Sequence, residues 1–138
     1  MAKHAVADQH TDPRLRCPKD ATLMEKIKVG DLVVDHCARC GSMWFDPYEL
    51  EAVIKLKGAA ARVDYGAADY EYQWNVHRAS SLLCPRDHSE LITVPDSRQA
   101  HIEIDLCSAC GGILLDAGEL KDLNEFTLKE RLKAFLHR

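Results

Sequence analysis

The chain has 138 residues, of which 46% are hydrophobic and 29% are charged, and its formal net charge is -4. This composition excludes a disordered chain, and no apolar run approaches the roughly 20 residues that a membrane span needs. The negative charge disfavours a protein whose main task is to grip nucleic-acid backbones, because such binding relies on clustered Lys and Arg.

The N-terminal stretch MAKHAVADQHTDPRLR has no regular apolar pattern, and we expect residues 1–16 to form a flexible segment. The stretch also lacks the apolar core of a signal peptide, so we expect a cytoplasmic location. Thiols stay reduced in that compartment, and the six cysteines therefore favour metal binding over disulfides.

The first predicted unit, residues 17–58, begins with the turn CPKD and continues into a β-hairpin. The stretches TLMEKIKV and LVVDH flank a Gly-Asp dipeptide, a connection that tight hairpin turns favour. The second strand leads into CARCG, where Cys37 and Cys40 have the spacing of two thiolate ligands on one zinc knuckle. Gly41 suits the positive φ that the chain often adopts after the second thiolate.

A short helix is predicted after this knuckle. In DPYE, Asp46 has the position of an N-cap, Pro47 that of the first helical residue, and Glu49 completes a capping box. The helix is expected to end at Gly58. Its apolar stripe consists of Leu50, Val53 and Ile54.

Residues 59–83 are predicted to be a linker that contains several aromatic side chains. Their alternation with polar residues is typical of a strand, but the same residues also have helical spacing, so both possibilities stay open. The residues concerned are Tyr70, Tyr72, Trp74 and Val76.

The frame of the first unit recurs in residues 84–125, which begin with CPRD and contain DLCSACG. The second copy is longer between its two cysteine motifs, which places the added residues in the hairpin loop, where LITV and AHIEIDL flank PDSRQ. Asp116 and Glu119 repeat the capping box, and Leu120 and Leu123 begin a new apolar stripe. Four apolar residues are expected to pack each knuckle against its helix, namely Trp44, Phe45, Leu114 and Leu115.

The last predicted element is an amphipathic helix over residues 126–138. It follows a second capping box, TLKE, and its apolar side would carry Leu128, Leu132, Phe135 and Leu136.

Spacing alone leaves the fourth ligand of each zinc site open. Asp20 and Asp87 stand where a zinc ribbon usually has another cysteine, and carboxylates are accepted zinc ligands. His36 and His88 are competitors, but they occupy different positions in the two copies. Water is the third possibility, and each Asp would then be only a turn residue.

The choice of fourth ligand separates structural zinc from catalytic zinc. Three protein ligands and a water are typical of a catalytic site, which would indicate a hydrolase or a metal-handling protein. Three thiolates make zinc electron-rich, however, and no further His, Ser or Lys recurs beside both motifs. We therefore expect structural zinc, which would stabilise units whose cores are too small to fold alone.

Disulfides within the two Cys-x-x-Cys motifs would instead indicate a redox protein of the thioredoxin type. The expected βαβ context is missing, and Cys17 and Cys84 would have no role. Three basic residues lie beside the candidate ligands and could offset the charge of the metal clusters or be ordinary solvated turn residues. They are Lys19, Arg39 and Arg86.

These motifs resemble the small bacterial zinc ribbons of the transcription factor IIB type, in two tandem copies. That pattern is Cys-Pro-x-Cys or Cys-Pro-x-Asp, followed by Cys-x-x-Cys-Gly-Gly-x-Trp-Leu-Asp-x-Gly-Glu-Leu. The resemblance implies a small, metal-stabilised α+β fold with two antiparallel hairpins, each followed by a helix, and two zinc ions. The ligands that it implies are Cys17, Asp20, Cys37 and Cys40 in the first copy and Cys84, Asp87, Cys107 and Cys110 in the second.

The function that we expect is a non-enzymatic module or adaptor that binds another protein. Binding to nucleic acid or the transcription machinery is the first alternative, with KLKGAAAR and LKERLKAFLHR as the basic segments. A zinc-dependent hydrolase or metal-handling protein with an open coordination position is the second. No membrane association is expected.

Overall fold

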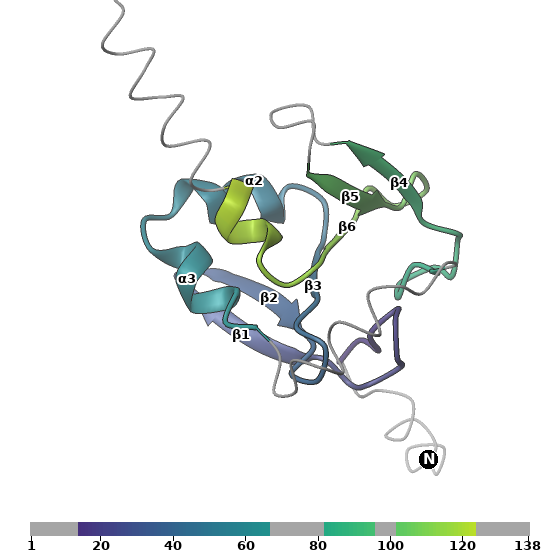
Figure 1. Cartoon of the computed structure of the whole chain (residues 1–138), viewed down its shortest axis with the longest axis horizontal. Helices are drawn as coiled ribbons and strands as arrows, with labels where there is room; N and C mark the ends of the chain where they lie inside the picture. Colours follow the sequence, from purple (N-terminus) through teal and green to yellow (C-terminus); the bar gives the residue numbers. More distant parts are fainter. Residues whose placement is uncertain (1–13, 67–81, 96–101, 124–138) are drawn as a thin grey trace, which may run out of the picture.

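The computed structural model of the chain describes residues 14–66, 82–95 and 102–123 (Figure 1). Most of the predicted N-terminal segment, the aromatic part of the linker and the C-terminal amphipathic helix lie outside the described residues. Within the described ranges, no helix has the length and apolar character that crossing a membrane requires.

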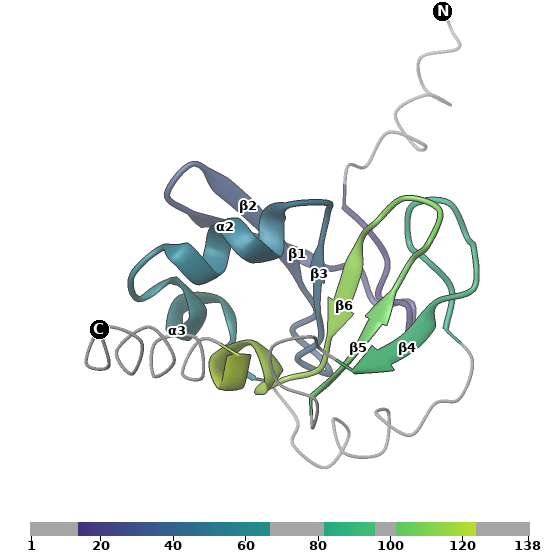
Figure 2. The same cartoon turned by 90° about the horizontal axis from the view of Figure 1, so that it is seen from above.

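Both ribbons contribute to one antiparallel sheet with the strand order β1-β2-β3-β6-β5-β4. The strands of the first ribbon are β1 (Glu25–Val29), β2 (Leu32–His36) and β3 (Met43–Phe45). Those of the second are β4 (Ile92–Pro95), β5 (Glu103–Leu106) and β6 (Ile113–Leu115). Figure 2 shows the two hairpins on opposite sides of the central strands β3 and β6.

The central pair relates the ribbons by an approximate two-fold axis. Trp44 of β3 lies directly opposite Leu114 of β6, and these two residues have the same position in the sequence repeat. The repeats therefore meet edge to edge in one sheet and do not form separate units.

Both predicted hairpins are present. Strands β1 and β2 pair from Glu25 opposite His36 to Val29 opposite Leu32, so the turn consists of Gly30 and Asp31. Strands β4 and β5 pair in the same manner. Pro95, which the sequence placed in the PDSRQ loop, instead belongs to β4 and pairs with Glu103, and residues 96–101 lie outside the described part of the chain.

Successive side chains of β3 and β6 point to opposite faces of the sheet, and each face is covered by a separate core. Phe45 and Leu115 face a core that includes the helix residues Leu50 and Leu120. Trp44 and Leu114 face a second core that contains the cysteines. All four predicted packing residues are fully buried, and they divide between the two faces of the sheet.

The helices gather beside one face of the first hairpin (Figure 1). They are α2 (Glu49–Lys55), α3 (Ala59–Val63) and a helical stretch at residues 119–123. The prediction that the first helix ends at Gly58 is wrong, because Leu56 is already extended and Gly58 (φ 77°) begins α3. Helix α3 was not predicted; its Ala59, Ala60 and Val63 are buried in the helix-side core.

The predicted capping boxes form only in part. Glu49 Oε1 accepts a hydrogen bond from the Asp46 amide at 2.8 Å, as expected, and Glu119 does the same for Asp116. The prediction that Asp46 caps α2 is wrong, since the N-cap residue is Tyr48 and no side chain caps it. Both aspartates instead turn towards the other ribbon.

These aspartates form two ion pairs that exchange partners between the ribbons. Arg86 of the second ribbon holds Asp46 through two hydrogen bonds of 2.9 and 2.6 Å. Lys19 of the first ribbon pairs with Asp116, and the Lys19 side chain is only 3% exposed. Burial opposes ionisation of Asp46, but the Arg86 guanidinium and the Trp44 indole N–H together lower its pKa. The basic residue of each Cys-Pro turn thus contacts the opposite ribbon.

The helical stretch of the second ribbon is capped by a residue from the predicted linker. Asp64, which is 1% exposed, accepts hydrogen bonds from the amides of Gly118 (2.9 Å) and Lys121 (3.2 Å). This carboxylate satisfies two amides that a helix start leaves without partners. It takes the place that the sequence had assigned to Asp116.

The indole of Trp44 requires a glycine in the other ribbon. A Cβ atom at Gly112 would lie 2.1 Å from Trp44 Cζ2, closer than any real contact allows. The first ribbon has Ser42 at the position of Gly112, and the second has Leu114 at the position of Trp44. The larger ring therefore faces the smaller residue.

We predict that Gly112→Ala lowers the free energy of unfolding by about 3 kcal/mol, because the methyl group must displace the ring. The same substitution should cost less than about 1 kcal/mol in a Trp44→Leu background. Denaturant unfolding of the four zinc-loaded proteins measures both values. Equal costs in the two backgrounds would contradict this steric explanation.

Candidate metal centres

Two clusters of ligand-type side chains form at the turns of the two ribbons. In each cluster, the four potential donor atoms lie within 4.8 Å of one another. One contains Cys17, Asp20, Cys37 and Cys40, and the other contains Cys84, Asp87, Cys107 and Cys110. The structure thus brings together, in two groups of four, the eight residues that the resemblance implied as ligands.

The turns of the first ribbon share one backbone geometry. The Cys37 carbonyl accepts from Gly41 N–H at 2.7 Å, and the Cys37 amide donates to Ser42 at 2.8 Å. The Cys17 carbonyl accepts from Ala21 at 2.8 Å, and the Cys17 amide donates to Thr22 at 2.8 Å. The residue just before the positive-φ position is Cys40 in one turn and Asp20 in the other, so the carboxylate stands where a ligand stands.

The second ribbon repeats this arrangement. Hydrogen bonds join Cys84 to His88 and Ser89, and others join Cys107 to Gly111 and Gly112. The sequence indicated positive φ at Gly41 (φ 85°), and its counterpart Gly111 has φ 83°. It gave no such signal for Ala21 (φ 63°) and His88 (φ 66°). Their place, four residues after the first cysteine of a knuckle, is the signal that could have identified them.

Each aspartate stabilises its own turn through a hydrogen bond to a backbone amide and also faces the thiols of its cluster. Asp20 Oδ1 accepts from the Thr22 amide at 3.0 Å, and Asp87 Oδ1 accepts from the Ser89 amide at 2.9 Å. Both Asp20 oxygens lie 3.8 Å from Cys37 Sγ, and those of Asp87 lie 3.6 and 3.5 Å from Cys107 Sγ. The turn role and the ligand role are therefore compatible.

The spacing of the donor atoms fits tetrahedral zinc. Zinc–sulfur bonds of about 2.3 Å and zinc–oxygen bonds of about 2.0 Å give tetrahedral edges of roughly 3.8 Å between sulfurs and 3.5 Å between sulfur and oxygen. The sulfurs of Cys17 and Cys40 are 3.6 Å apart, and those of Cys84 and Cys110 are 3.7 Å apart. All six cysteines are free thiols, and these distances far exceed the roughly 2.05 Å of a disulfide.

Burial and the hydrogen bonds between neighbouring thiols keep one thiol of each cluster, Cys17 and Cys84, protonated. The hydrogen bonds that the Cys17 thiol donates to Cys37 and Cys40, together with burial, raise the pKa of Cys17, and the same bonds lower the pKa of Cys40. Burial raises the pKa of Cys84 to about 12. Since zinc takes thiolates as ligands, metal binding must release these protons, and the affinity for zinc falls as the pH falls.

Backbone amides support the thiolate form. The Cys40 amide donates to Cys37 Sγ at 3.4 Å, and the Arg86 amide donates to Cys84 Sγ at 3.3 Å. The Gly112 amide donates to Cys110 Sγ at 3.4 Å. Hydrogen bonds to sulfur favour the charged thiolate, which is the zinc ligand.

Neither histidine considered as a competing ligand belongs to a cluster. His36 is fully buried in β2, where its ring stacks on Tyr65 with centroids 4.0 Å apart. Burial lowers the pKa of His36, which favours the neutral ring. His88 lies exposed at the turn after Asp87.

The two centres differ in exposure. In the first, all three cysteines are buried and Asp20 is half-buried. In the second, Asp87 is exposed and Cys110 is half-buried. Water and small chelators therefore have better access to the second centre.

Comparison with protein families gives a match to the model described as "Transcription factor zinc-finger", of the zinc-ribbon type named after transcription factor IIB. The match covers residues 16–56 and 83–125, which together are more than half of the chain. Comparison with curated proteins and with solved structures gives no significant match. The matched regions each contain one of the clusters, in agreement with two zinc ions, one per ribbon.

Substitutions of Asp20 and Asp87 separate the ligand role from the turn role. Asparagine keeps an oxygen for the Thr22 or Ser89 amide but is a weak, neutral ligand, so we expect zinc affinity to fall by on the order of 100-fold. Cysteine at either position should retain tight binding. Competition with a chromophoric chelator measures the affinities, and unchanged affinity in the asparagine variants would mean that water completes the sphere.

We further predict that a chelator removes the two zinc ions in two kinetic phases, with the second centre emptied first. Cys110→Ser should eliminate the fast phase, and the matched Cys40→Ser should eliminate the slow one. Stopped-flow absorbance with an excess of chelator resolves the phases. A fast phase that disappears in Cys40→Ser would reverse the assignment.

Proposed function

Because the chain belongs to the family of transcription factor IIB-type zinc ribbons, we propose that it is a non-enzymatic module that binds another protein. The observation that carries this proposal is the closed donor set of each centre, three cysteines and one aspartate around one point. Structural zinc has four protein ligands, whereas catalytic zinc keeps one position for water or substrate. Three thiolates would also leave the metal a weak Lewis acid.

The shared sheet supports the interaction part of the proposal. Two short ribbons joined through β3 and β6 present surfaces to which both contribute. The acidic net charge of -4 suits contact with a basic partner protein better than contact with phosphate. A cytoplasmic location, where thiols stay reduced, is part of the same proposal.

Nucleic-acid binding is the second candidate, and one observation favours it. A groove of about 480 Å³ lies between the two Cys-Pro turns, and its lining includes Arg14, Arg16 and His88. Arg16 Nη1 already donates to the Ala21 carbonyl at 2.9 Å, which leaves less of the guanidinium for a ligand. We rank this candidate second for that reason and because of the overall charge.

One set of measurements on the zinc-loaded protein distinguishes these functions. We expect two zinc ions per chain, loss of the folded circular-dichroism spectrum on chelation, and a partner that is retained after nuclease treatment of a native extract. We expect no gel shift with DNA or RNA at about 0.15 M salt, where non-specific contacts are screened.

The outcomes that would overturn the proposal are equally specific. A gel shift that survives this salt concentration, without a nuclease-resistant protein partner, would establish the second candidate. Hydrolysis of chromogenic esters or phosphate esters that is faster with the zinc-loaded protein than with the zinc-depleted protein would establish a catalytic centre.

A further inference from the structure

The fold requires a left-handed backbone conformation before α2, but it does not require a tyrosine at that position. Tyr48, the N-cap of α2, has φ 73° and ψ -10°, in the left-handed region where a Cβ atom is strained. Gly118, at the same position in the second ribbon, has φ 91°. A glycine at position 48 would adopt this conformation without strain. The Tyr48 side chain is 84% exposed, so its packing contributes little that would offset the strain.

Tyr48 lines a groove to which both ribbons contribute. The groove has a volume of about 590 Å³, and the second ribbon supplies Cys110, Gly111 and Ile113 to its wall. Pro47 lies against Gly111, since a Cβ atom at that glycine would be 3.4 Å from Pro47 Cγ. We call this feature the Tyr48 groove; its remaining lining residues are Asp46, Leu50 and Glu51.

The groove opens on only one of the two knuckles. Cys110 is half-buried and Gly111 is exposed, whereas their counterparts Cys40 and Gly41 are buried. The strained tyrosine therefore stands beside the accessible metal centre.

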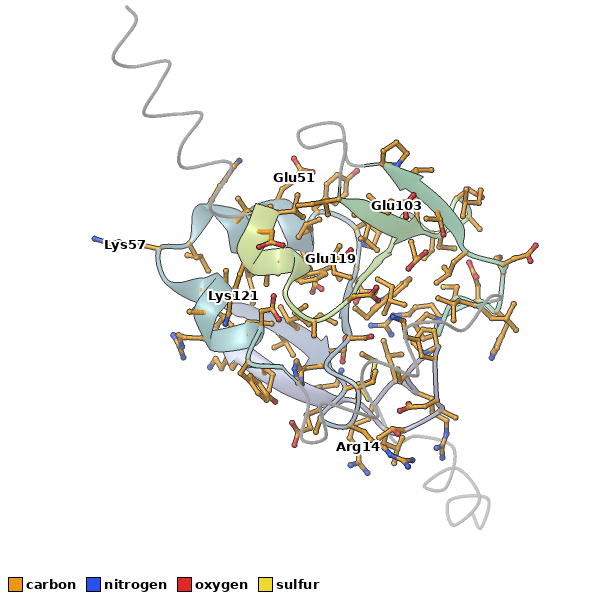
Figure 3. The ribbon with its side chains drawn as sticks, viewed as in Figure 1. Arg14, Glu51, Lys57, Glu103, Glu119 and Lys121 are labelled. Atoms are coloured by element: carbon orange, nitrogen blue, oxygen red, sulfur yellow. The ribbon has the colours of Figure 1, made fainter. Side chains whose placement is uncertain are left out.

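Negative charge gathers at this groove. Glu51 is exposed and projects outward from α2, and Arg14 lies at the opposite end of the molecule (Figure 3). Cys110 belongs to a centre whose three thiolates and one carboxylate outweigh the charge of one Zn²⁺. Asp46 adds a carboxylate, although Arg86 pairs with it. An electronegative ring face beside carboxylates and thiolates attracts a cation and repels phosphate.

We propose that the Tyr48 groove binds a basic peptide segment of a partner protein, with an Arg or Lys side chain lying on the Tyr48 ring. This inference rests on the proposed function and specifies the chemistry of the partner. In this proposal, the backbone strain at Tyr48 is tolerated because its ring contacts the bound peptide. Apolar side chains of the segment would contact Pro47 and Ile113.

The test begins with a random array of 12-residue peptides and the zinc-loaded, full-length protein. We expect the enriched peptides to contain Arg or Lys next to an apolar residue. The binding of one enriched peptide is then measured by fluorescence anisotropy for the parent protein and for Tyr48→Gly, Tyr48→Phe, Glu51→Gln and the control Ile92→Ser. Ile92 is an exposed apolar residue of β4, 47% accessible and outside the groove lining.

Tyr48→Gly should weaken binding by at least about tenfold, as loss of an aromatic anchor does. It should also raise Tm by about 2–4 °C, because relief of the left-handed strain exceeds the added freedom of glycine in the unfolded chain. Tyr48→Phe should bind within about threefold of the parent, since the ring is retained. Glu51→Gln should weaken binding and reduce its dependence on salt, and Ile92→Ser should leave it unchanged.

Two results would overturn the inference, and they are distinguishable. Enriched peptides that are acidic, or that bind the Tyr48→Gly variant as tightly as the parent protein, would show that the Tyr48 groove is not the binding site for a basic segment. The proposed protein-binding function would remain intact. An array without enriched peptides, together with a nucleic-acid gel shift that survives about 0.15 M salt, would instead contradict the proposed function itself.

Discussion

The pairing of β3 with β6 is the contact on which the rest of this small protein depends. Each ribbon alone has three short strands and a helix, and the burial of Trp44, Phe45, Leu114 and Leu115 requires both ribbons together. The shared sheet creates one core on its helix side and another around the cysteines. Zinc, which contributes on the order of 10 kcal/mol per structural site, then secures the turns at the ends of the strands.

The metal centres and the contact between the ribbons are mechanically connected. Lys19 lies between Cys17 and Asp20 on a ligand turn, yet its ammonium group contacts Asp116 at the helix start of the other ribbon. Arg86 connects the second centre with Asp46 in the same way. A turn that holds a metal therefore also positions the neighbouring ribbon, and the two halves are coupled through charges as well as through the sheet.

Local spacing explains how much of this structure the sequence predicts. The hairpins and the two Cys-x-x-Cys knuckles follow from patterns a few residues long that recur in both copies, whereas the grouping of Asp20 and Asp87 with the cysteines was implied by the family resemblance. Strand pairing between the copies and the ion pair of Lys19 with Asp116, 97 residues away, depend on complementarity that no local pattern records. Asp64 was overlooked for the same reason, since it caps a helix 54 residues further along the chain.

The contact of Trp44 with Gly112 also decides which strands meet. Two first ribbons from separate chains would bring Trp44 against Ser42, whose Cβ occupies the space that Gly112 leaves free. Two second ribbons would bring together Leu114 and Gly112, with no large ring to fill that space. The central strand pair therefore packs best when it contains one ribbon of each kind. The linker of residues 59–83 places both kinds in the same molecule. Divergence between the repeats thus favours an intramolecular sheet over strand exchange between copies of the chain.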